Sequence, residues 1–426
     1  DVKIDVSDTG GDNFEFEDDQ RGKAALSVQG KGNVEIELDG NNELKSGKGR
    51  AGLEKTSAGT LTLKDDKEAG SLTATGGYNG AGIGGGNNGS GKNITINGGE
   101  VNATGGSESA GIGGGSSGSG KNITINGGTV NAAGGGWGAG IGGGWMGNGE
   151  NITITGGTVA AHAYDAGAGI GGGNNGSGNN ITIKGGEVKA TGGRYGAGIG
   201  GGQDGNGNNI TINGGSVTAA GDDSGAGIGG GATGSGENIT ITGGTVNAAG
   251  IFGGAGIGGG ANGIGSKVTV SGAAHVTATA TGSQDPDRYG VGTGATIGNG
   301  GTKTPDGKSA DGKEIQADIN GLTTGYIHHI IYNEDGSLKR EWWEFARPKP
   351  TPDGPNAPAE ESNEVDLGTP VLHVETLEGD LLPFDARQQG GTLRVTSDTL
   401  AARLHGTRQA LEALREQGVE QIQFVT

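Results

Sequence analysis

The sequence has no cysteine among its 426 residues, so disulfides and thiolate metal sites are both excluded. Aromatic residues make up only 4% and hydrophobic residues 30%, too few for one large core of the usual kind. The chain has 9 prolines and no glycine at every third position, which excludes a collagen triple helix. It also lacks an apolar run near the ~18 residues of a membrane span and an apolar targeting segment before Asp1. We therefore expect a soluble piece, processed or excised, without membrane insertion.

Positive charge is also scarce. The chain has 29 basic and 48 acidic residues, for a formal net charge of −19. An acidic surface of this size repels nucleic acid and anionic membranes, so we expect no nucleic-acid partner.

Glycine is the abundant residue, with 103 copies, and its positions follow a fixed period. An Asn-Ile-Thr-Ile string recurs every 29 residues from Asn93 to Asn238, and a valine follows each copy from Val101 to Val246. Fixed periods of this length are typical of solenoids. The string Ala-Gly-Ile-Gly-Gly-Gly keeps the same step, with its isoleucine at Ile83, Ile112, Ile141, Ile170, Ile199, Ile228 and Ile257.

The alternation of apolar and polar residues predicts strands within each repeat. In residues 93–97 β-branched apolar residues alternate strictly with polar ones, the pattern of a half-buried strand. Each repeat supplies three such short strands, joined by glycine-rich turns. Stacking pairs each strand with its copy about 4.8 Å away. We predict an all-β fold, a parallel β-helix of three-strand, 29-residue coils. Parallel crossovers favour the right-handed form.

Composition and period divide the chain into five parts. We predict atypical capping coils at 1–77, regular β-helix coils at 78–300, a β-hairpin cap at 301–346, a proline-rich linker at 347–364 and a small αβ domain at 365–426.

The last two structured parts have their own patterns. In the hairpin, the expected strands 327–332 and 337–345 flank a turn and cap the open end of the stack. The C-terminal α+β unit has expected strands at 371–375, 392–396 and 419–425. A helix is expected from Ser397 as N-cap to a stop at Gly418.

Several chemical motifs can be weighed against this fold. The Gly-x-Gly-x-x-Gly strings lack the helix that a phosphate site needs. The Asn-Ile-Thr glycosylation pattern is explained by a polar ladder on an outward face, and its neutral amides bind divalent ions weakly. Paired His328 and His329 point to opposite faces of a strand and cannot chelate one ion together. We expect no cofactor, with calcium as a weak candidate at a cluster that could equally be a solvated edge: Asp8, Asp12, Glu15, Glu17, Asp18 and Asp19.

Catalysis is the next possibility, since several polysaccharide lyases and hydrolases are parallel β-helices, an analogy from fold alone. Asp222 and Asp223 are the only close acids in residues 76–260, and they are sequence neighbours. We expect Arg194 and Lys189 to have no acidic partner at matched register in the adjacent coils. Without a general acid and base pair, we expect no enzyme.

Aromatic residues stand out in the variable segment before the Ala-Gly-Ile-Gly strand. We expect them to lie along one edge of the stack, at least partly exposed, because a turn cannot bury large rings. Aromatic faces on a neutral, hydrogen-bonding surface suit sugar rings; alternatively, the turns fold over one another and shield the rings. The candidates are Tyr78, Trp137, Tyr164, Tyr195 and Phe252, with Trp145 at the other end of the strand that follows Trp137.

Three stretches resemble known bacterial surface proteins. Residues 33–42, 51–53 and 70–77 resemble "carbohydrate-binding domain-containing" proteins, and the Gly-Ala-Gly-Ile-Gly-Gly-Gly coils resemble repeats of large cell-wall proteins of Firmicutes. The resemblance implies a secreted or cell-surface bacterial protein. We expect a non-enzymatic, adhesin-like β-helix with a glycan-binding face, whose partner is a glycan or a host or cell-surface protein. A structural stalk or protein-binding adhesin, and a lyase-like or hydrolase-like β-helix, are the alternatives.

Overall fold

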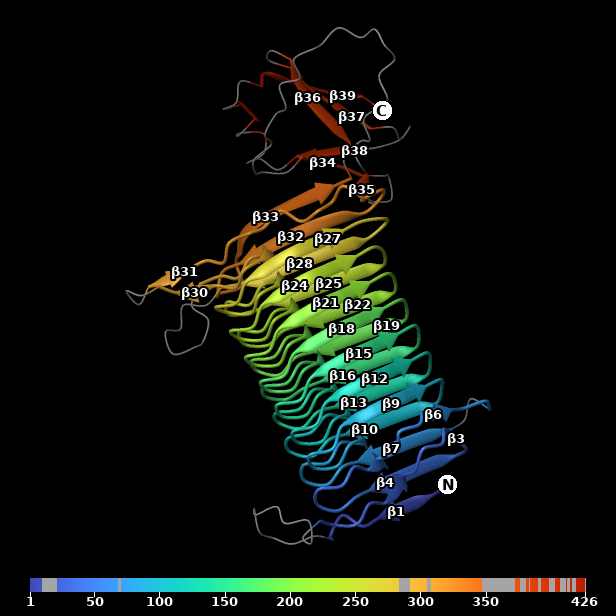
Figure 1. The fold of residues 1–426 in the computed structure, drawn as a ribbon. Helices are drawn as coiled ribbons and strands as arrows, with labels where there is room; N and C mark the ends of the chain where they lie inside the picture. The colour runs from blue at the N-terminus through green and yellow to red at the C-terminus, as the bar shows by residue number, and fades with distance from the viewer. Residues whose placement is uncertain are drawn as a thin grey trace.

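The computed structural model describes residues 1–9, 21–67, 70–282, 292–304 and 308–346. In the C-terminal part it describes residues 372–375, 381–382, 384–389, 392–397, 403–406, 411, 414–415 and 419–425. Within these residues the strands form a long stack of coils that rises from the N-terminus toward the C-terminal part (Figure 1). Three sheets of 12, 10 and 9 strands, here named A, B and C, make up the stack.

Sheet A contains the third strand of each coil and ends in a hairpin. Its order is β1 (Lys3–Asp5), β4 (Asn41–Lys45), β7 (Ser71–Thr75), β10 (Glu100–Thr104), β13 (Thr129–Ala133), β16 (Thr158–His162), β19 (Glu187–Thr191), β22 (Ser216–Ala220), β25 (Thr245–Gly250), β28 (His275–Thr281), β32 (Tyr326–Tyr332) and β33 (Leu338–Phe345).

Sheet B contains the first strand of each regular coil, and from β8 onward these strands have two residues. Its order is β2 (Leu26–Val28), β5 (Leu53–Lys55), β8 (Ile83–Gly84), β11 (Ile112–Gly113), β14 (Ile141–Gly142), β17 (Ile170–Gly171), β20 (Ile199–Gly200), β23 (Ile228–Gly229), β26 (Ile257–Gly258) and β29 (Ile297–Gly298).

Sheet C contains the longer second strand. Its order is β3 (Val34–Glu37), β6 (Leu61–Lys64), β9 (Gly91–Ile96), β12 (Gly120–Ile125), β15 (Gly149–Ile154), β18 (Gly178–Ile183), β21 (Gly207–Ile212), β24 (Gly236–Ile241) and β27 (Gly265–Val270).

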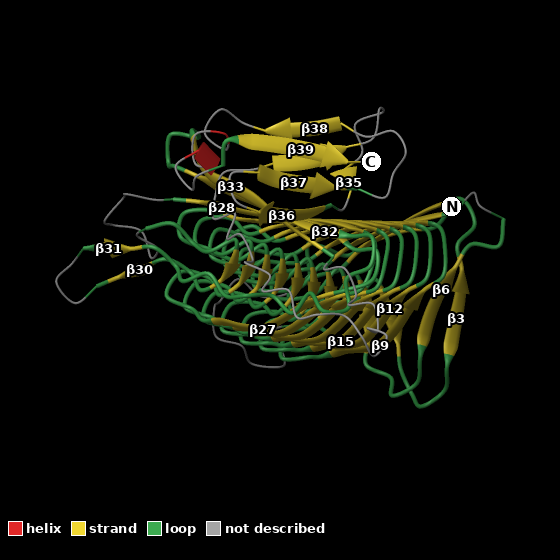
Figure 2. Ribbon diagram, turned by 90° about the horizontal axis from the view of Figure 1, so that it is seen from above, coloured by secondary structure: helices red, strands yellow, loops and turns green. Residues whose placement is uncertain are grey.

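The coils stack in the predicted register. Ile112 pairs with Ile83 and with Ile141, and the same step of 29 holds in sheets A and C. The neighbouring strands run parallel, and from above the strands of successive coils lie over one another (Figure 2). The predicted all-β parallel β-helix of three-strand coils is confirmed.

The core is a column of small aliphatic side chains inside the coils. Ile94, Ile96, Val101 and Ile112 are fully buried, and their equivalents one coil away are buried too. In sheets A and C the buried residues alternate with outward polar ones, so the period of two read from the sequence places two isoleucine rows on the inner face of sheet C and a valine row on that of sheet A. In sheet B the isoleucine row stands between buried glycines.

The C-terminal end of the stack is closed by two devices. Leu322 and Ile319 join the core, and the segment that carries them bonds to β27, where the Asp318 N–H donates to the Val268 carbonyl at 2.8 Å. The hairpin of β32 and β33 extends sheet A, with β32 parallel to β28 and antiparallel to β33. Two further short strands, β30 (Thr302–Lys303) and β31 (Ser309–Ala310), pair antiparallel beside this end.

The C-terminal part has its own buried cluster, which includes Val374, Leu393 and Leu414. Its strands form two three-stranded sheets: β34 (Leu372–Glu375) with β35 (Leu381–Leu382) and β38 (Arg403–Gly406), and β36 (Asp385–Gln389) with β37 (Thr392–Thr396) and β39 (Gln421–Val425).

The predicted helix from Ser397 to Gly418 is wrong over residues 403–406. These residues form β38, which pairs antiparallel with β34, so strand pairing overrides the local helical pattern. The Ser397 N–H donates to the Val425 carbonyl at 2.9 Å, and residues 398–402, where the predicted helix would begin, lie outside the described residues. Among the described residues of this unit, only 411 and 414–415 are helical. No helix in the described part of the chain is long and apolar enough to cross a membrane.

Candidate functional site

The aromatic candidates lie in the turns that flank sheet B. We call the turns between sheets A and B the leading turns, and those between sheets B and C the trailing turns. The leading turns are 76–82, 105–111, 134–140, 163–169, 192–198, 221–227 and 251–256, and the trailing turns are 85–90, 114–119, 143–148, 172–177, 201–206, 230–235 and 259–264.

A tight corner brings the two kinds of turn together. In one coil the Ala139 N–H donates to the Gly143 carbonyl at 2.9 Å, which folds the chain back around the two-residue strand β14. Gly142 in this corner has φ +137°, and a Cβ there would overlap the carbonyl oxygen of Gly171 in the next coil. The Ala-Gly-Ile-Gly segment therefore acts as a corner as much as a strand, and its two flanking turns become neighbours.

This corner creates a ring pair that the sequence did not indicate. The centroids of Trp137, in a leading turn, and Trp145, in the following trailing turn, are 5.8 Å apart, and the ring planes are inclined by 47°. We expected Trp145 at the far end of a strand. The contact between the two rings depends on the positive φ of Gly142, and a run of glycines in the sequence does not indicate the sign of φ.

The rings are at least partly exposed, as predicted. Tyr164 is 63% exposed, Trp137 40% and Tyr78 38%, whereas Trp145, Tyr195 and Phe252 are half-buried. Mutual shielding therefore accounts for only part of the ring surface.

The five leading-turn rings lie along one edge of the stack, but they do not share one vertical column. Positions 29 residues apart are equivalent, so Trp137 and Tyr195 share a column, two coils apart. Tyr78 and Phe252 share the neighbouring column, six coils apart, and Tyr164 lies in a third. The candidates divide into a central group, formed by the two tryptophans, Tyr164 and Tyr195, and two separate rings toward the ends.

Polar side chains accompany the central group. The His162 ring meets Tyr164 edge-on at 4.8 Å, and the Arg194 guanidinium lies over the Tyr195 ring at 5.4 Å. Arg194 also pairs with Asp223 of the next coil, with Nε 3.4 Å from the carboxylate. The expectation that Arg194 has no acidic partner at matched register is therefore wrong: the two positions differ by one 29-residue step, which the sequence already contained.

Met146, next to Trp145, has an unfavourable backbone. Its φ is +56°, and 58% of its surface is exposed. Asparagine holds the equivalent position at Asn88 and Asn175, with φ +59° in both, and asparagine tolerates this conformation well. A large apolar residue here is unfavourable because its backbone is strained and its side chain is exposed to water. Stability alone therefore does not explain the choice of methionine beside the central group.

A family model described as "Beta helix repeat" matches seven segments, at 68–87, 94–116, 123–145, 152–174, 181–203, 210–232 and 239–261. The seven matched segments are thus similar to β-helix repeats, in agreement with the parallel β-helix of the structure. Comparisons with curated proteins and with solved structures gave no match. The segment 123–145 of the β-helix repeat runs from sheet C to the trailing turn, and so contains both tryptophans of the central group.

Sheet C of the β-helix repeats carries an amide ladder. Asn122 Nδ2 donates to Asn93 Oδ1 at 2.8 Å, and Asn151 Nδ2 donates to Asn122 Oδ1 at 3.0 Å. The ladder continues in the same way through Asn180, Asn209 and Asn238. The amides of the Asn-Ile-Thr strings are thus engaged with one another, which accounts for their spacing.

Only one residue of the weak calcium candidate cluster lies within the described part of the chain. Asp8 is exposed beside β1, whereas Asp12, Glu15, Glu17, Asp18 and Asp19 lie outside the described residues. Within the described ranges of the chain, no group of three or more His, Asp or Glu residues is arranged to hold a metal ion.

The two histidines of the cap face opposite ways, as predicted. His329 is buried, with Nδ1 2.6 Å from Thr296 Oγ1, and its ring stacks on Trp342. His328 stacks on Trp343 at 3.6 Å and contacts Glu341 at 2.6 Å. Burial lowers the pKa of His328 despite the neighbouring carboxylate. His329 thus joins the hairpin to the last coil through Thr296, whereas these contacts of His328 lie within the hairpin.

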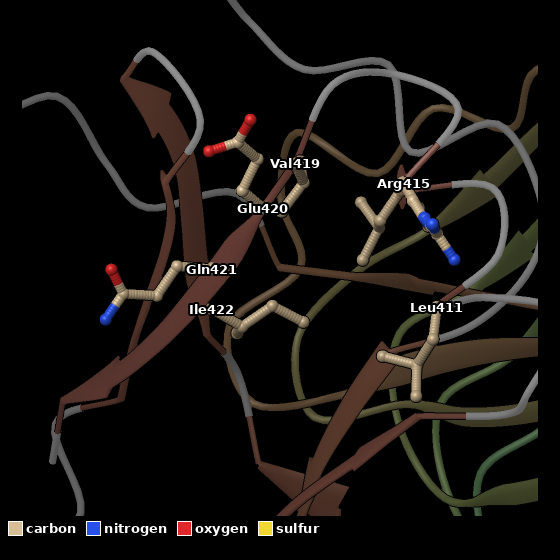
Figure 3. A pocket seen from close by; sticks show the side chains of 7 residues that line it. Leu411, Arg415, Val419, Glu420, Gln421 and Ile422 are labelled. Atoms are coloured by element: carbon tan, nitrogen blue, oxygen red, sulfur yellow. The ribbon is translucent and has the colours of Figure 1, made fainter.

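The C-terminal part contains a pocket of about 620 Å³. Figure 3 shows its labelled residues on β39, with Gln421 and Ile422, and on the segment around Leu411 and Arg415. Its lining mixes aliphatic residues with Arg415, Glu420 and Gln421 and contains no aromatic residue, so it differs from the aromatic central group, and none of the predicted site residues lies there.

Proposed function

We propose that this β-helix protein is a non-enzymatic, secreted or cell-surface bacterial protein of the adhesin type, and that the central aromatic group on its turns binds a glycan. The observation that supports this most directly is the pair Trp137 and Trp145, with ring planes inclined by 47° and Trp137 40% exposed. Exposed amphipathic rings are costly on a free surface and suit stacking against the apolar faces of sugars. The resemblance to carbohydrate-binding surface proteins points the same way.

A glycan array tests this function with the full chain. We expect binding to be lost when Trp137→Ala and Tyr195→Ala are combined, because both lie in one column of the central group. Ile264→Ala is the matched control, since Ile264 is also apolar and 61% exposed but lies in a turn outside the group. Binding that survives the double substitution contradicts the proposed site.

A stalk or spacer is the second candidate. The unbroken strand stacking and the amide ladder favour it, because both produce a stiff rod. If the wild-type chain binds no sugar on the array, and its cooperative thermal unfolding shows that it is folded, the spacer function replaces the glycan function.

Lyase activity is separable with one assay. We expect incubation with acidic polysaccharides and calcium to give no ultraviolet absorbance from unsaturated products. Appearance of that absorbance would contradict the non-enzymatic assignment.

A further inference from the structure

The turns around the central group carry a one-sided charge. Between residues 105 and 235, the leading and trailing turns contain five acidic residues and one basic residue, Arg194. Arg194 is already paired with Asp223. A net negative charge therefore surrounds the exposed rings, in coils that otherwise carry little charge. The five acidic residues are Glu108, Asp165, Asp204, Asp222 and Asp223.

Two of these carboxylates flank the tryptophan pair. Glu108 occupies the position of Trp137 one 29-residue coil earlier. The backbone N–H of Trp145 donates to the backbone carbonyl of Glu108 at 2.7 Å. Asp165 follows in the next coil, where its N–H donates to the Gly136 carbonyl at 3.0 Å. Glu108 therefore lies one coil before Trp137 in the same column, about 4.8 Å away. Asp165 lies in the coil after the pair, in the neighbouring column, where its negative charge also helps to raise the pKa of Arg194.

The ring pair has a shape that suits a compact group. Two planes inclined by 47° with centroids 5.8 Å apart form a wedge, and the exposed Met146 adjoins it in sequence. Ser116 Oγ donates to Glu108 Oε2 at 2.6 Å, which fixes the carboxylate near the wedge. The same column already contains a cation over a ring, since Arg194 lies over Tyr195 two coils farther on.

These observations rest on the proposed glycan function and sharpen it. We propose that the wedge of Trp137 and Trp145, flanked by Glu108 and Asp165, binds an organic ammonium group carried by the ligand. The faces of the indole rings attract a cation through their quadrupole, and the carboxylates add a direct Coulomb attraction. An ammonium group that bears carbon substituents also makes apolar contact with the rings and with the Met146 thioether.

The negative charge of the turns disfavours acidic sugars as ligands and gives neutral sugars no advantage. A uronic or sialic acid residue bound at the rings would be repelled by Glu108 and Asp165, which carry charge of the same sign. A neutral sugar would stack on the rings but would gain nothing from the carboxylates. The ammonium can come from an amino sugar or from a choline-type substituent, and both share the same recognition chemistry.

Titration of the full chain with choline chloride tests the proposal, with 3,3-dimethylbutan-1-ol as the uncharged isostere. Binding is followed by tryptophan fluorescence and by the indole N–H signals in NMR spectra. We expect choline to bind at least about tenfold more tightly than the alcohol, and the difference to shrink in high salt because exposed charges are screened. Equal affinity for the two probes overturns the proposal.

Variants assign the effect to the flanking carboxylates. The double variant Glu108→Gln with Asp165→Asn is expected to lose about tenfold in choline affinity, and Asp222→Asn, an exposed acid outside the flanks, to lose none. Unfolding temperatures of all variants are measured alongside, so that lost binding is not misread as lost folding. An unchanged affinity in the double variant overturns the proposal.

A second pair of probes distinguishes the source of the ammonium and separates this proposal from the glycan function. Glucosamine oligomers present primary ammonium groups, whereas N-acetylglucosamine oligomers are uncharged. Tighter binding of the former identifies an amino sugar, and choline binding without glucosamine binding identifies a quaternary group. If both oligomers bind equally and binding still needs Trp137, the glycan function stands and the ammonium site is refuted.

Discussion

The first coils and the central coils are held together by different polar interactions. In the central coils, asparagines of equal position bond to one another from coil to coil, as Asn122 does to Asn93. In the first coils, charged residues take this place: Lys64 contacts Glu35 and Asp66 at 2.8 and 2.7 Å, and Glu43 contacts both Lys3 and Lys45. The Lys64–Glu35 pair lies on sheet C, as the neutral ladder does, whereas the Glu43 pairs lie on sheet A.

The first coils and the central coils also differ in length. In sheet B the step from Leu26 to Leu53 is 27 residues and the step to Ile83 is 30, whereas each step from Ile83 to Ile257 is 29. A short amide reaches its copy only when the coils are identical in length. Long charged side chains bridge coils of unequal length, so the first coils vary while the central ones cannot.

The largest effect is expected from the corner glycines of the central coils. Gly142→Ala places a Cβ against the Gly171 carbonyl and should cost at least about 3 kcal/mol of unfolding free energy. Gly30→Ala, in the first coils, is the matched control: its φ is +92° but nothing lies within 4 Å of the added carbon, so only the conformational cost of about 1–2 kcal/mol remains. Chemical denaturation of both variants measures the contrast. Equal losses would show that overlap between coils is unimportant.

The corner at Gly142 also separates the contacts that the sequence predicts from those that it does not. The period placed every isoleucine row, because a fixed step stacks equivalent positions whatever the turn geometry. The same step would have paired Arg194 with Asp223. The contact of Trp137 with Trp145 depends on the backbone of Gly142, where a glycine run permits several conformations. At residues 403–406 a distant strand, β34, decided the structure over a local helical pattern.

The amide ladder should contribute the next largest effect. Asn151 donates to Asn122 and accepts from Asn180, at a φ of +54°. Asn151→Gly removes both bonds while keeping the backbone relaxed, and should cost about 1 kcal/mol. Asn151→Ala adds the left-handed strain, about 1–2 kcal/mol more.

Lys64→Met provides the comparison in the first coils. Its charged partners are exposed or half-exposed, so the loss of stability should be smaller than that of Asn151→Gly and shrink further in salt. Denaturation at low and high salt distinguishes the two regions. A salt-dependent Asn151→Gly would contradict the neutral ladder.

Lys55 is a buried charge in the first coils, and burial lowers its pKa from the ordinary value of 10.5. The folded state therefore binds fewer protons than the unfolded state between this lowered pKa and 10.5, and stability from this group rises with pH across that window. Lys55→Met should remove the penalty and stabilise the protein by about 1 kcal/mol at neutral pH.

The pH dependence of the difference identifies the cause. The advantage of Lys55→Met over the wild type should shrink as pH rises toward 10.5, because the wild-type lysine then loses its charge. Denaturation of both proteins at neutral and alkaline pH gives this difference and cancels the contributions of the exposed lysines. An advantage that is constant with pH would point to packing instead of charge.

The last pair of substitutions lies within the central coils, at two residues of one trailing-turn column. Met146 and Thr233 have φ values of +56° and +64°, where their equivalents include asparagine. Thr233→Asn and Met146→Asn should each stabilise by about 1 kcal/mol, because asparagine adopts this conformation more readily. Only Met146 adjoins the tryptophan wedge, so Met146→Asn should also weaken choline or glycan binding, while Thr233→Asn leaves it unchanged. Thermal unfolding with a binding titration on both variants separates the two effects, and stabilisation without loss of binding at Met146 would leave its strained backbone without a functional explanation.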